Sequence, residues 1–440
     1  MLRCLTAYLC RLAVAKRCFH LVIILPAKRI KSAWKSCQIL RRWILLLYAI
    51  TFLLILPILF HDVRHSTFYL YLNKTAIKES MKNANSRRIV QAETYFSMLN
   101  SSGTFKQHVL HSSFGTNHTV TVALNIITVS RNRHQIDSYE PKYLTQTVWK
   151  FHSVLQRWPL HIDVHMSICN VDSMAASYHE AHTLSKFVPM YSRFNDTHFS
   201  LVHTLEKEKQ DYVYCLNKSL EVDKEADYVF LVEDDALPTD DVFEVLQHVI
   251  LMHTEQSFAR GEFHSKPSNV AFIKFYHPEW LLNFISFQPE RLPELLSYAA
   301  VLSSLLAIIY AVVCRVSAAS NTMTFDMCWR EFFLFSLLVV LACGRTGISE
   351  WRRLASPMFY SYTPAPSCCT PAMLFPRSAA QLTVTYLSNV TCHNNFGKDS
   401  VLDNMLRDLH LMAYLVQPNT FTHIGLYSSL RMRTVDPFMV

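Results

Sequence analysis

Three apolar runs without charged residues interrupt this chain and restrict how the remainder of it can fold. Trp43–Phe60 contains 18 residues, Leu295–Cys314 contains 20 and Phe332–Gly344 contains 13. The first two runs can cross a bilayer, whereas the third needs flanking residues to complete a span. The sequence therefore predicts one N-terminal membrane helix and, much later in the chain, a hairpin of two membrane helices.

Basic residues near the N-terminus predict the orientation of these helices. Residues 1–42 contain ten Lys or Arg and no Asp or Glu, in a chain whose net charge is +8. Because positive segments stay on the cytoplasmic side, we expect a cytosolic N-terminus and a luminal chain from residue 61 onward. A cleaved signal peptide is the alternative, but the small residues of a cleavage site do not follow Phe60. Since the charge belongs to this tail, it does not indicate a nucleic-acid groove.

The apolar runs and the charges divide the chain into eight expected parts. Asn-x-Ser/Thr sequons occur only in the expected luminal parts, which supports this division. The parts are a cytosolic basic tail (1–42), a transmembrane helix (43–60), a luminal stem (61–118), the first part of a luminal domain (119–294), a second transmembrane helix (295–314), a short cytosolic connection (315–328), a third transmembrane helix (329–344) and the second part of the luminal domain (345–440). Disulfides can form among the five luminal cysteines, with their pairing left open: Cys169, Cys215, Cys368, Cys369 and Cys392.

Strand-type and helix-type segments alternate in the first luminal part. The expected strands are Thr119–Val129, His161–Cys169 and Asp227–Val232, and the expected helices are Tyr143–Gln156 and Leu205–Leu220. This alternation predicts an α/β domain with a mostly parallel sheet covered on both faces. The seven Gly of the chain form no Gly-rich phosphate loop, which disfavours P-loop and dinucleotide-binding folds. Further expected elements are a stem helix over Ile77–Leu99, a strand at Leu382–Leu387 and a helix from Asp399 to Leu409.

The third of these strands ends in three adjacent carboxylates, Glu233, Asp234 and Asp235. Three like charges side by side raise each other's pKa, and a bound divalent cation removes that penalty. Mg²⁺ and Mn²⁺ prefer oxygen ligands and are often held jointly by carboxylates and substrate phosphates. Ligands of open α/β sheets also bind beyond the carboxyl ends of the strands. The alternative is a solvated turn leading into a helix, with Asp241 as its N-cap and Glu244 three residues later.

Longer motifs place these features in a family context. An N-terminal anchor, a luminal α/β domain and an acidic triplet at a strand end resemble Golgi glycosyltransferases of the GT-A fold. Six motifs that follow one another in the family's order narrow the resemblance to the three-pass post-GPI-attachment N-acetylgalactosaminyltransferase family. The resemblance covers about residues 43–432. The motifs are Glu206–Cys215, Val232–Ala236, Phe275–Glu279, Cys368–Pro376, Phe396–Asp399 and His423–Arg431. In that family a transmembrane hairpin interrupts the GT-A domain. The acidic motif and the His423 motif also resemble N-acetylglucosaminyltransferase IV enzymes, whereas Ser130 departs from the Asp that is frequent in the family.

The resemblance implies an inverting, metal-assisted transferase of the Golgi membrane. Its donor is expected to be UDP-GalNAc, and its acceptor the first mannose of the GPI glycan on GPI-anchored proteins. Mn²⁺ or Mg²⁺ is the implied cofactor, which as a Lewis acid neutralises the UDP leaving group. The implied metal ligands are Glu233, Asp235 and His423, and an ordinary packed histidine is the alternative for His423. Asp234 is implied to bind the cofactor beside these ligands, directly or through water. The implied nucleotide-binding residues are Val129 and Arg131 on the uridine side and Lys209, Ser428, Ser429 and Arg431 at the phosphates, and a solvated helix position is the alternative for Lys209.

An inverting transfer also needs a base near the acceptor hydroxyl. We expect Asp399 in this role, with Glu279 and Glu206 as rivals, although Asp399 also suits a helix N-cap. Two other functions remain open from the sequence alone. One is a glycosyltransferase with another donor sugar or acceptor, and the other is a membrane receptor for GPI-anchored proteins that catalyses no reaction.

Overall fold

The computed structural model describes residues 45–60, 66, 74–101, 120–131, 139–157, 161–194, 203–259, 269–284, 291–316, 325–428 and 433–436. The predicted basic tail lies outside the described residues, as do Ser429 and Arg431. The chain separates into two compact units. We call residues 71–283 and 348–440 the sheet unit, and residues 1–70 and 284–347 the helical unit.

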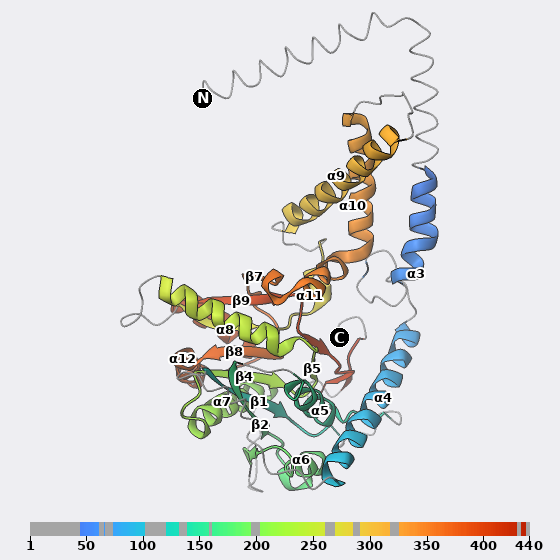
Figure 1. Ribbon diagram of the computed structural model, residues 1–440. Helices are drawn as coiled ribbons and strands as arrows, with labels where there is room; N and C mark the ends of the chain where they lie inside the picture. The colour runs from blue at the N-terminus through green and yellow to red at the C-terminus, as the bar shows by residue number, and fades with distance from the viewer. Residues whose placement is uncertain are drawn as a thin grey trace, which may run out of the picture. The chain divides into compact units, whose positions relative to one another are not determined.

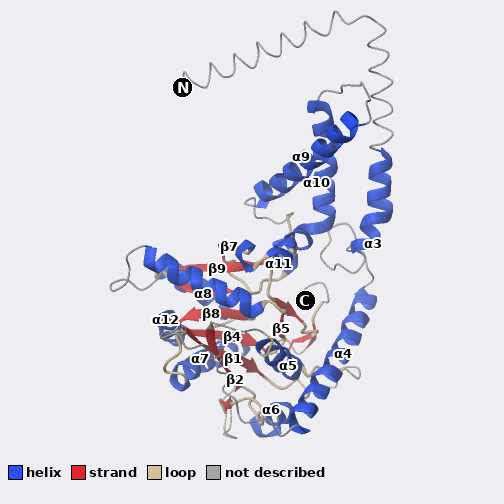
Figure 2. Cartoon of the chain, in the orientation of Figure 1, coloured by secondary structure: helices blue, strands red, loops and turns tan. Residues whose placement is uncertain are grey.

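An eight-stranded sheet forms the centre of the sheet unit, with the strand order β3-β2-β1-β4-β8-β6-β9-β7 (Figures 1 and 2). The pairs β3–β2, β2–β1, β1–β4 and β6–β9 are parallel, whereas both pairs of β8 and the pair β7–β9 are antiparallel. The predicted α/β class with a large, mostly parallel sheet is therefore confirmed. The strands are β1 (Val120–Thr128), β2 (Ile162–Asn170), β3 (Met190–Ser192), β4 (Tyr228–Glu233), β6 (Val270–Lys274), β7 (Ser361–Pro364), β8 (Ala372–Pro376) and β9 (Met412–Gln417).

Side chains of the central strands alternate between two hydrophobic cores, one on each face of the sheet, because successive strand residues point to opposite faces. Phe230 and Val232 of β4 pack in the core that α5 and α8 cover. Val229 and Leu231 pack in the core that α7, α12 and α13 cover, which also contains the Cys169–Cys215 disulfide between β2 and α7. The helices are α5 (Tyr143–Leu155), α7 (Thr204–Val222), α8 (Val242–Ala259), α12 (Arg377–Ser388) and α13 (Lys398–Asp408).

A two-stranded sheet brings the C-terminal part of the chain to the end of β4. β5 (Ala236–Pro238) follows the acidic triplet and pairs antiparallel with β10 (Phe421–His423), which sets His423 opposite Ala236. The backbone N–H of Ile424 also donates to the carbonyl of Asp235 at 2.8 Å. Residues far apart in the sequence therefore meet at the carboxyl end of β4. A second small sheet joins β11 (Tyr427–Ser428) to β12 (Arg433–Thr434).

The predicted stem helix is α4 (Lys74–Ser101), and it packs against α5 within the sheet unit. Asn85 donates to the carbonyl of Glu140 at 2.9 Å, and the Arg88 guanidinium donates to Gln146 Oε1 at 2.7 Å. Phe96 is buried in the core that contains α5. The helix therefore contributes to the folded domain and does not act only as a spacer.

The expected strand at Leu382–Leu387 is wrong, because this segment belongs to α12. Ala380, Thr383 and Leu387 are buried, and their spacing of three and four residues follows the period of a helix. The helix packs on the core that contains α7. The alternating Leu, Val and Thr residues suggest a strand locally, but packing against α7 selects the helical period instead.

The helical unit contains α9 (Leu292–Val316) and all but the last two residues of α10 (Phe325–Ser349), together with η2 (Thr51–Ile55) and α3 (Leu56–Phe60) near the N-terminus. Leu292–Val313 and Trp329–Ser349 are long and apolar enough to cross a membrane. Leu45–Phe60 is a shorter apolar helix among the described residues. α10 contains the third apolar run and extends it on both sides, which supplies the missing length. These helices support a membrane association for the chain.

Candidate functional site

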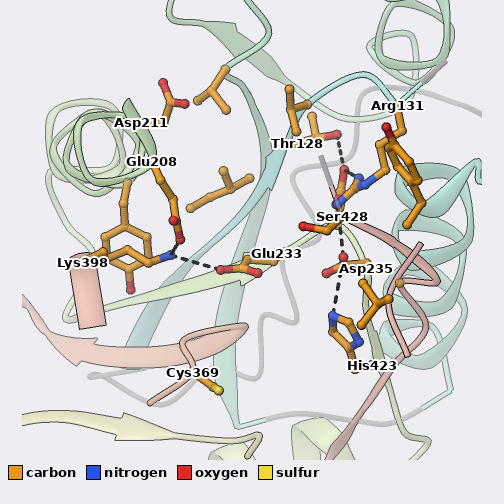
Figure 3. A pocket seen from close by; sticks show the side chains of 18 of the residues that line it. Thr128, Arg131, Glu208, Asp211, Glu233, Asp235, Cys369, Lys398, His423 and Ser428 are labelled. Carbon is orange, nitrogen blue, oxygen red and sulfur yellow. Dashed lines mark hydrogen bonds and ion pairs between the residues drawn. The ribbon is translucent and has the colours of Figure 1, made fainter. Parts of the chain in front are cut away.

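A cavity of about 620 Å³ lies at the carboxyl ends of β1 and β4 in the sheet unit (Figure 3). Its wall contains the last residues of β1, the acidic triplet after β4 and residues 171–173 that follow β2. Parallel strands place such a crevice at their carboxyl ends, where open α/β sheets bind ligands. Residues from α7, the start of α13 and the segment 423–428 also contribute to the wall.

The three adjacent carboxylates of the triplet are held by partners from different parts of the chain. Glu233 pairs with Lys398, Asp234 pairs with Arg131, and Asp235 lies between Arg131 and His423. Two backbone hydrogen bonds fix the triplet, from Glu233 N to the carbonyl of Pro371 at 2.7 Å and from Asp234 N to that of Ile127 at 3.0 Å. Two cations from different parts of the chain, Arg131 and Lys398, therefore reduce the repulsion predicted from the sequence.

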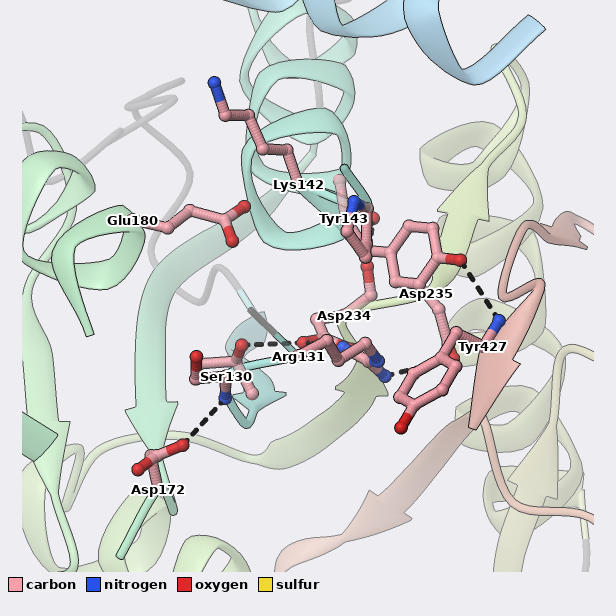
Figure 4. A network of polar contacts seen from close by, with 12 residues as sticks. Ser130, Arg131, Lys142, Tyr143, Asp172, Glu180, Asp234, Asp235 and Tyr427 are labelled. Atoms are coloured by element: carbon pink, nitrogen blue, oxygen red, sulfur yellow. Dashed lines mark hydrogen bonds and ion pairs between the residues drawn. The ribbon is translucent and has the colours of Figure 1, made fainter. Parts of the chain in front are cut away.

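Asp234 is held inside the protein and does not offer a free carboxylate to the cavity (Figure 4). Its side chain is 2% exposed, and Oδ2 accepts from Arg131 Nη1 at 2.6 Å. The Thr128 hydroxyl donates to the same oxygen at 2.6 Å, and the Thr147 hydroxyl donates to the Asp234 carbonyl at 2.7 Å. Burial raises the pKa of Asp234, and the Arg131 guanidinium opposes that shift. This carboxylate therefore joins the end of β1 to the end of β4.

Arg131 also organises the neighbouring side of the cavity. Its guanidinium donates to Asp235 Oδ2 at 3.1 Å and lies 4.9 Å from the centre of the Tyr143 ring. One residue earlier, the backbone N–H of Ser130 donates to Asp172 Oδ2 at 2.9 Å (Figure 4). Residue 130 is Ser where the family frequently has Asp, but the carboxylate of Asp172, which follows β2, contacts the backbone of Ser130. Both Asp172 and Arg131 line the cavity.

Asp235 and His423 form the part of the cavity that best suits a divalent cation. His423 Nε2 lies 3.6 Å from Asp235 Oδ2 (Figure 3). Asp235 Oδ1 and His423 Nδ1 are both buried and have no hydrogen-bond partner in the structure. A Cβ on Gly425 would lie 2.5 Å from Asp235 Oδ2 and 3.0 Å from His423 Cε1, so the close approach requires glycine. A carboxylate and an imidazole with free lone pairs fit a cation that substrate phosphates complete.

The described residues contain no group of three or more His, Cys, Asp or Glu side chains that is arranged to hold a metal. Glu233, the third ligand expected from the sequence, turns away from Asp235 toward Lys398. The residues present therefore fit a cation held by two protein ligands together with ligands from a substrate. They do not form a closed structural metal site.

Lys398 is the buried cation on the opposite side of the cavity. Its side chain is 4% exposed, and Nζ lies 3.0 Å from Glu208 Oε1 and 3.2 Å from Glu233 Oε1. The ammonium also lies 4.7 Å from the centre of the Tyr212 ring. About a third of the Glu208 and Glu233 side chains remains exposed, at 32% and 33%. Burial raises the pKa of Glu233 above its usual range, and Lys398 opposes that shift.

The other residues expected from the sequence are divided between the cavity and the protein interior. Val129 and Ser428 line the cavity, as do Arg131 and His423. Lys209 does not line it, because its ammonium is buried and donates to the carbonyls of Leu387 and Val390. Ser429 and Arg431 lie outside the described residues, so their positions stay predictions.

The three expected base candidates are not among the described residues that line the cavity. Asp399 Oδ2 accepts from the backbone N–H of Cys369 at 2.8 Å, and Glu206 accepts from Cys392 N at 2.7 Å. Both carboxylates therefore hold backbone segments in place. Glu279 follows Pro278 and precedes Trp280, which do line the cavity.

Glu208, Lys398 and Gly425 line the cavity but have no role among the expectations from the sequence. Glu208 and Lys398 lie within the motifs that carry the family resemblance, next to residues expected in the site. This position in the sequence could have identified them as candidate site residues. Gly425 could have been identified in the same way, because it lies two residues after His423 in the same motif. The pairing of Glu208 and Lys398 depends on α7 and α13 meeting in space, which their sequence separation does not show.

One comparison with known proteins bears on this site. A family model described as GPI-N-acetylgalactosamine transferase PGAP4 matches residues 122–422. The match covers more than half of the chain and spans both segments of the sheet unit with α9 and α10 between them. It includes the acidic triplet and Lys398.

Proposed function

Because the chain belongs to the family of the GPI-N-acetylgalactosamine transferase PGAP4, we propose that it transfers GalNAc from UDP-GalNAc to the first mannose of the GPI glycan on GPI-anchored proteins. Membership supports a transferase and implies GPI-anchored acceptors. The donor, the metal and inversion at the sugar belong to the proposal. So does the assignment of the sheet unit to the GT-A fold, which the position of the triplet at the end of β4 supports.

The pair of Asp235 and His423 carries this proposal. The diphosphate of a nucleotide sugar gains negative charge as the glycosidic bond breaks, and a nearby cation stabilises that charge. Asp235 and His423, each of which has a buried side-chain atom without a hydrogen-bond partner, would hold Mn²⁺ or Mg²⁺ beside the diphosphate. When bound, the cation acts as a Lewis acid for the departing UDP. Ser428 lines the same cavity and is placed in the proposal as a phosphate-binding hydroxyl.

The remaining walls of the cavity suit the other parts of the donor. Val129 and Arg131 follow β1 and are proposed to border the uridine, with Arg131 fixed by Asp234 and Asp235. Glu233 and Lys398 lie on the other side, where we place the sugar. A carboxylate accepts hydrogen bonds from sugar hydroxyls and an ammonium donates to them, so this pair suits recognition of the donor sugar.

Glu208 is the carboxylate that the geometry favours as the catalytic base. It lines the cavity with about a third of its side chain exposed, and its Oε1 lies 3.0 Å from Lys398 Nζ. A base must reach the proton of the acceptor hydroxyl, so access to the cavity comes first. Asp399, Glu279 and Glu206, the candidates from the sequence, are retained as alternative proposals.

Membrane attachment suits an acceptor that is itself anchored in lipid, and we propose a multi-pass Golgi protein with a cytosolic N-terminus and a luminal sheet unit. Directly after α10, the helix α11 (Trp351–Ala355) and the turn η6 (Pro357–Phe359) carry large exposed apolar side chains. Leu354 is 88% exposed and Met358 is 76% exposed. Exposed apolar and aromatic residues beside a membrane helix are typical of the interface with lipid headgroups.

A donor assay tests the proposed activity. Full-length protein in detergent is incubated with a panel of UDP-sugars, with and without Mn²⁺, and released UDP is measured. We expect hydrolysis that is fastest with UDP-GalNAc, that a chelator abolishes, and that Asp235→Asn lowers by more than about 100-fold. Equal rates for the wild type and Asp235→Asn, or a clear preference for another UDP-sugar, would contradict the proposal.

The membrane helices are tested separately, in a variant whose residues 292–349 are replaced by a soluble linker. This variant should preserve hydrolysis of UDP-GalNAc but lower transfer to GPI-anchored proteins in membranes, because tethering raises the effective concentration of the acceptor. Equal transfer to membrane-embedded acceptors by the variant and the wild type would show that the hairpin has no such role.

A further inference from the structure

Two adjacent cysteines, Cys368 and Cys369, form part of the cavity wall (Figure 3 labels Cys369). Both are partly exposed and neither is bonded to another cysteine in the structure. The proposed transfer reaction uses neither thiol. Adjacent thiols in the wall of a cavity therefore need an explanation of their own.

The segment that carries the two cysteines is held rigidly from both sides. Lys274, which is buried at the end of β6, donates to the carbonyls of Pro366 at 2.8 Å and Cys368 at 2.9 Å. Asp399 accepts from the backbone N–H of Cys369 at 2.8 Å. A buried lysine with its charge directed at a loop backbone is costly unless hydrogen bonds satisfy it. The Cys368 carbonyl and the Cys369 N–H belong to the peptide bond that joins the two cysteines, so these two contacts hold that bond in place.

The two cysteines are neighbours in the chain, and their local backbone conformation is unusual. Cys369 has a φ of 69°, a left-handed conformation that residues other than glycine rarely adopt. The two neighbouring thiols perturb each other, which lowers the pKa of Cys368 and raises that of Cys369. One sulfur is therefore the better nucleophile, and the other is its immediate neighbour.

The structure also shows that this chain forms disulfides. Cys169 and Cys215 are joined across β2 and α7. Structural disulfides persist in oxidising compartments and are rare elsewhere. Partly exposed neighbouring thiols in the same chain meet the same oxidants.

From these observations we propose that Cys368 and Cys369 close reversibly into a disulfide between neighbouring residues, which makes the cavity wall sensitive to thiol and disulfide reagents. The oxidant is a disulfide, either a small molecule or the active site of a thiol oxidoreductase. The Cys368 thiolate attacks it, so one S–S bond breaks, a mixed disulfide forms and one thiolate leaves. The Cys369 sulfur loses its proton and attacks the Cys368 sulfur, which expels the second thiolate. Two thiols of the protein lose two electrons and two protons, and the oxidant is reduced to two thiols.

Such a bond is labile for a geometric reason. Neighbouring Cα atoms are about 3.8 Å apart across a trans peptide, whereas disulfide-bonded residues have Cα atoms about 4.4–6.8 Å apart. The Cys169–Cys215 bridge, with a Cα–Cα distance of 5.9 Å, lies within that range. Strained and accessible disulfides are the ones that reductants open first. The two bonds of the chain should therefore differ in their resistance to reduction.

Differential alkylation of the full-length protein tests the proposal. Protein purified without reductant is denatured and alkylated with iodoacetamide, then reduced and alkylated with N-ethylmaleimide, and its peptides are read by mass spectrometry. We expect Cys368 and Cys369 to carry only the second label, and the buried thiol of Cys392 to carry the first. When native protein is first treated with increasing dithiothreitol, Cys368 and Cys369 should lose their protection before Cys169 and Cys215.

Two variants distinguish this pairing from others. In Cys369→Ser, the remaining Cys368 should carry the first label, whereas Cys392→Ser should leave the labelling of Cys368 and Cys369 unchanged. First label on both cysteines of the wild type, a cross-linked peptide that joins either one to Cys392, or loss of Cys169–Cys215 protection first would overturn the proposal. The wild-type measurement does not depend on how the variants fold. No donor or acceptor is needed, so the outcome is independent of the proposed transfer reaction.

Discussion

Replacing Arg131 with Met removes the guanidinium that pairs with Asp234 and Asp235 while retaining an unbranched side chain. The Arg131 side chain is 9% exposed, and Asp234 is 2% exposed, so water cannot readily take the place of the ion pair. The Thr128 hydroxyl remains as a donor to Asp234 at 2.6 Å. The variant therefore leaves a buried carboxylate with one neutral donor in place of a cation.

The expected cost follows from that burial. Removing one partner of a buried ion pair typically costs about 3–5 kcal/mol. Because one hydroxyl remains, we expect about 3 kcal/mol for Arg131→Met, which corresponds to a fall in Tm of roughly 5–10 °C for a domain of this size. Without Arg131, the pKa of Asp234 in the folded protein rises further above its unfolded value of about 3.9. The penalty then grows with pH above that value, so the loss should be larger at about pH 8 than at about pH 5.

Thermal unfolding of the full-length protein in detergent, at both pH values, gives the measurement. Lys150→Met is the matched control, because its ion pair with Asp240 at 2.6 Å involves a carboxylate side chain that is 67% exposed. An exposed pair contributes at most about 1 kcal/mol, so this variant should resemble the wild type. Adding Asp234→Asn to Arg131→Met should restore most of the lost stability. A fall in Tm no larger than that of Lys150→Met, or no recovery in the double variant, would refute this reasoning.

Two other perturbations have outcomes that follow from single contacts. Gly425→Ala places a Cβ 2.5 Å from Asp235 Oδ2 and should lower donor hydrolysis by about 10–100-fold. Gly397→Ala, whose Cβ meets the Leu205 side chain no closer than 3.6 Å, should retain activity, and equal rates for both variants would contradict the proposed cation site. His165→Gln tests pH dependence, because the hydrogen bond to Asp223 raises the pKa of His165. That stabilisation is complete below about pH 6.5 and is lost as pH rises through the raised pKa of His165. The difference in Tm between His165→Gln and the wild type should therefore shrink from about pH 6 to about pH 9. A difference in Tm that stays constant over this range would contradict the prediction.

The parts of the fold visible in the sequence are those that local apolar patterns define. β1, β2 and β4 are buried runs bounded by polar residues, and α5, α7 and α13 have helical spacing, so their positions follow from the sequence. β8 is different, because it lies antiparallel between β4 and β6 although α9 and α10 precede it in the chain. Its five residues carry no sign of that insertion. The local pattern of α12 indicates a strand, although the segment is a helix. Packing against α7, rather than the residues of α12 alone, selects the helical period.

The candidate site could likewise be predicted only in part from the sequence. The acidic triplet and His423 are visible because their chemistry is local to short motifs. The directions of their side chains are not, because these depend on cations supplied by distant elements. Lys209 and Lys398 illustrate this point, since both are buried lysines within motifs of the family resemblance. Tertiary structure directs Lys209 to carbonyls at the end of α12 and Lys398 to Glu233 in the cavity.

The central claim is that this chain adds GalNAc to GPI glycans through a site that depends on Asp235. Cells that lack the protein are supplied with the wild type, with Asp235→Asn or with the control Lys150→Met, and released GPI glycans are analysed by mass spectrometry. The account predicts a HexNAc branch on the first mannose with the wild type and with Lys150→Met, and its absence with Asp235→Asn at equal protein levels. A branch restored in full by Asp235→Asn, or absent with the wild type, would contradict the account.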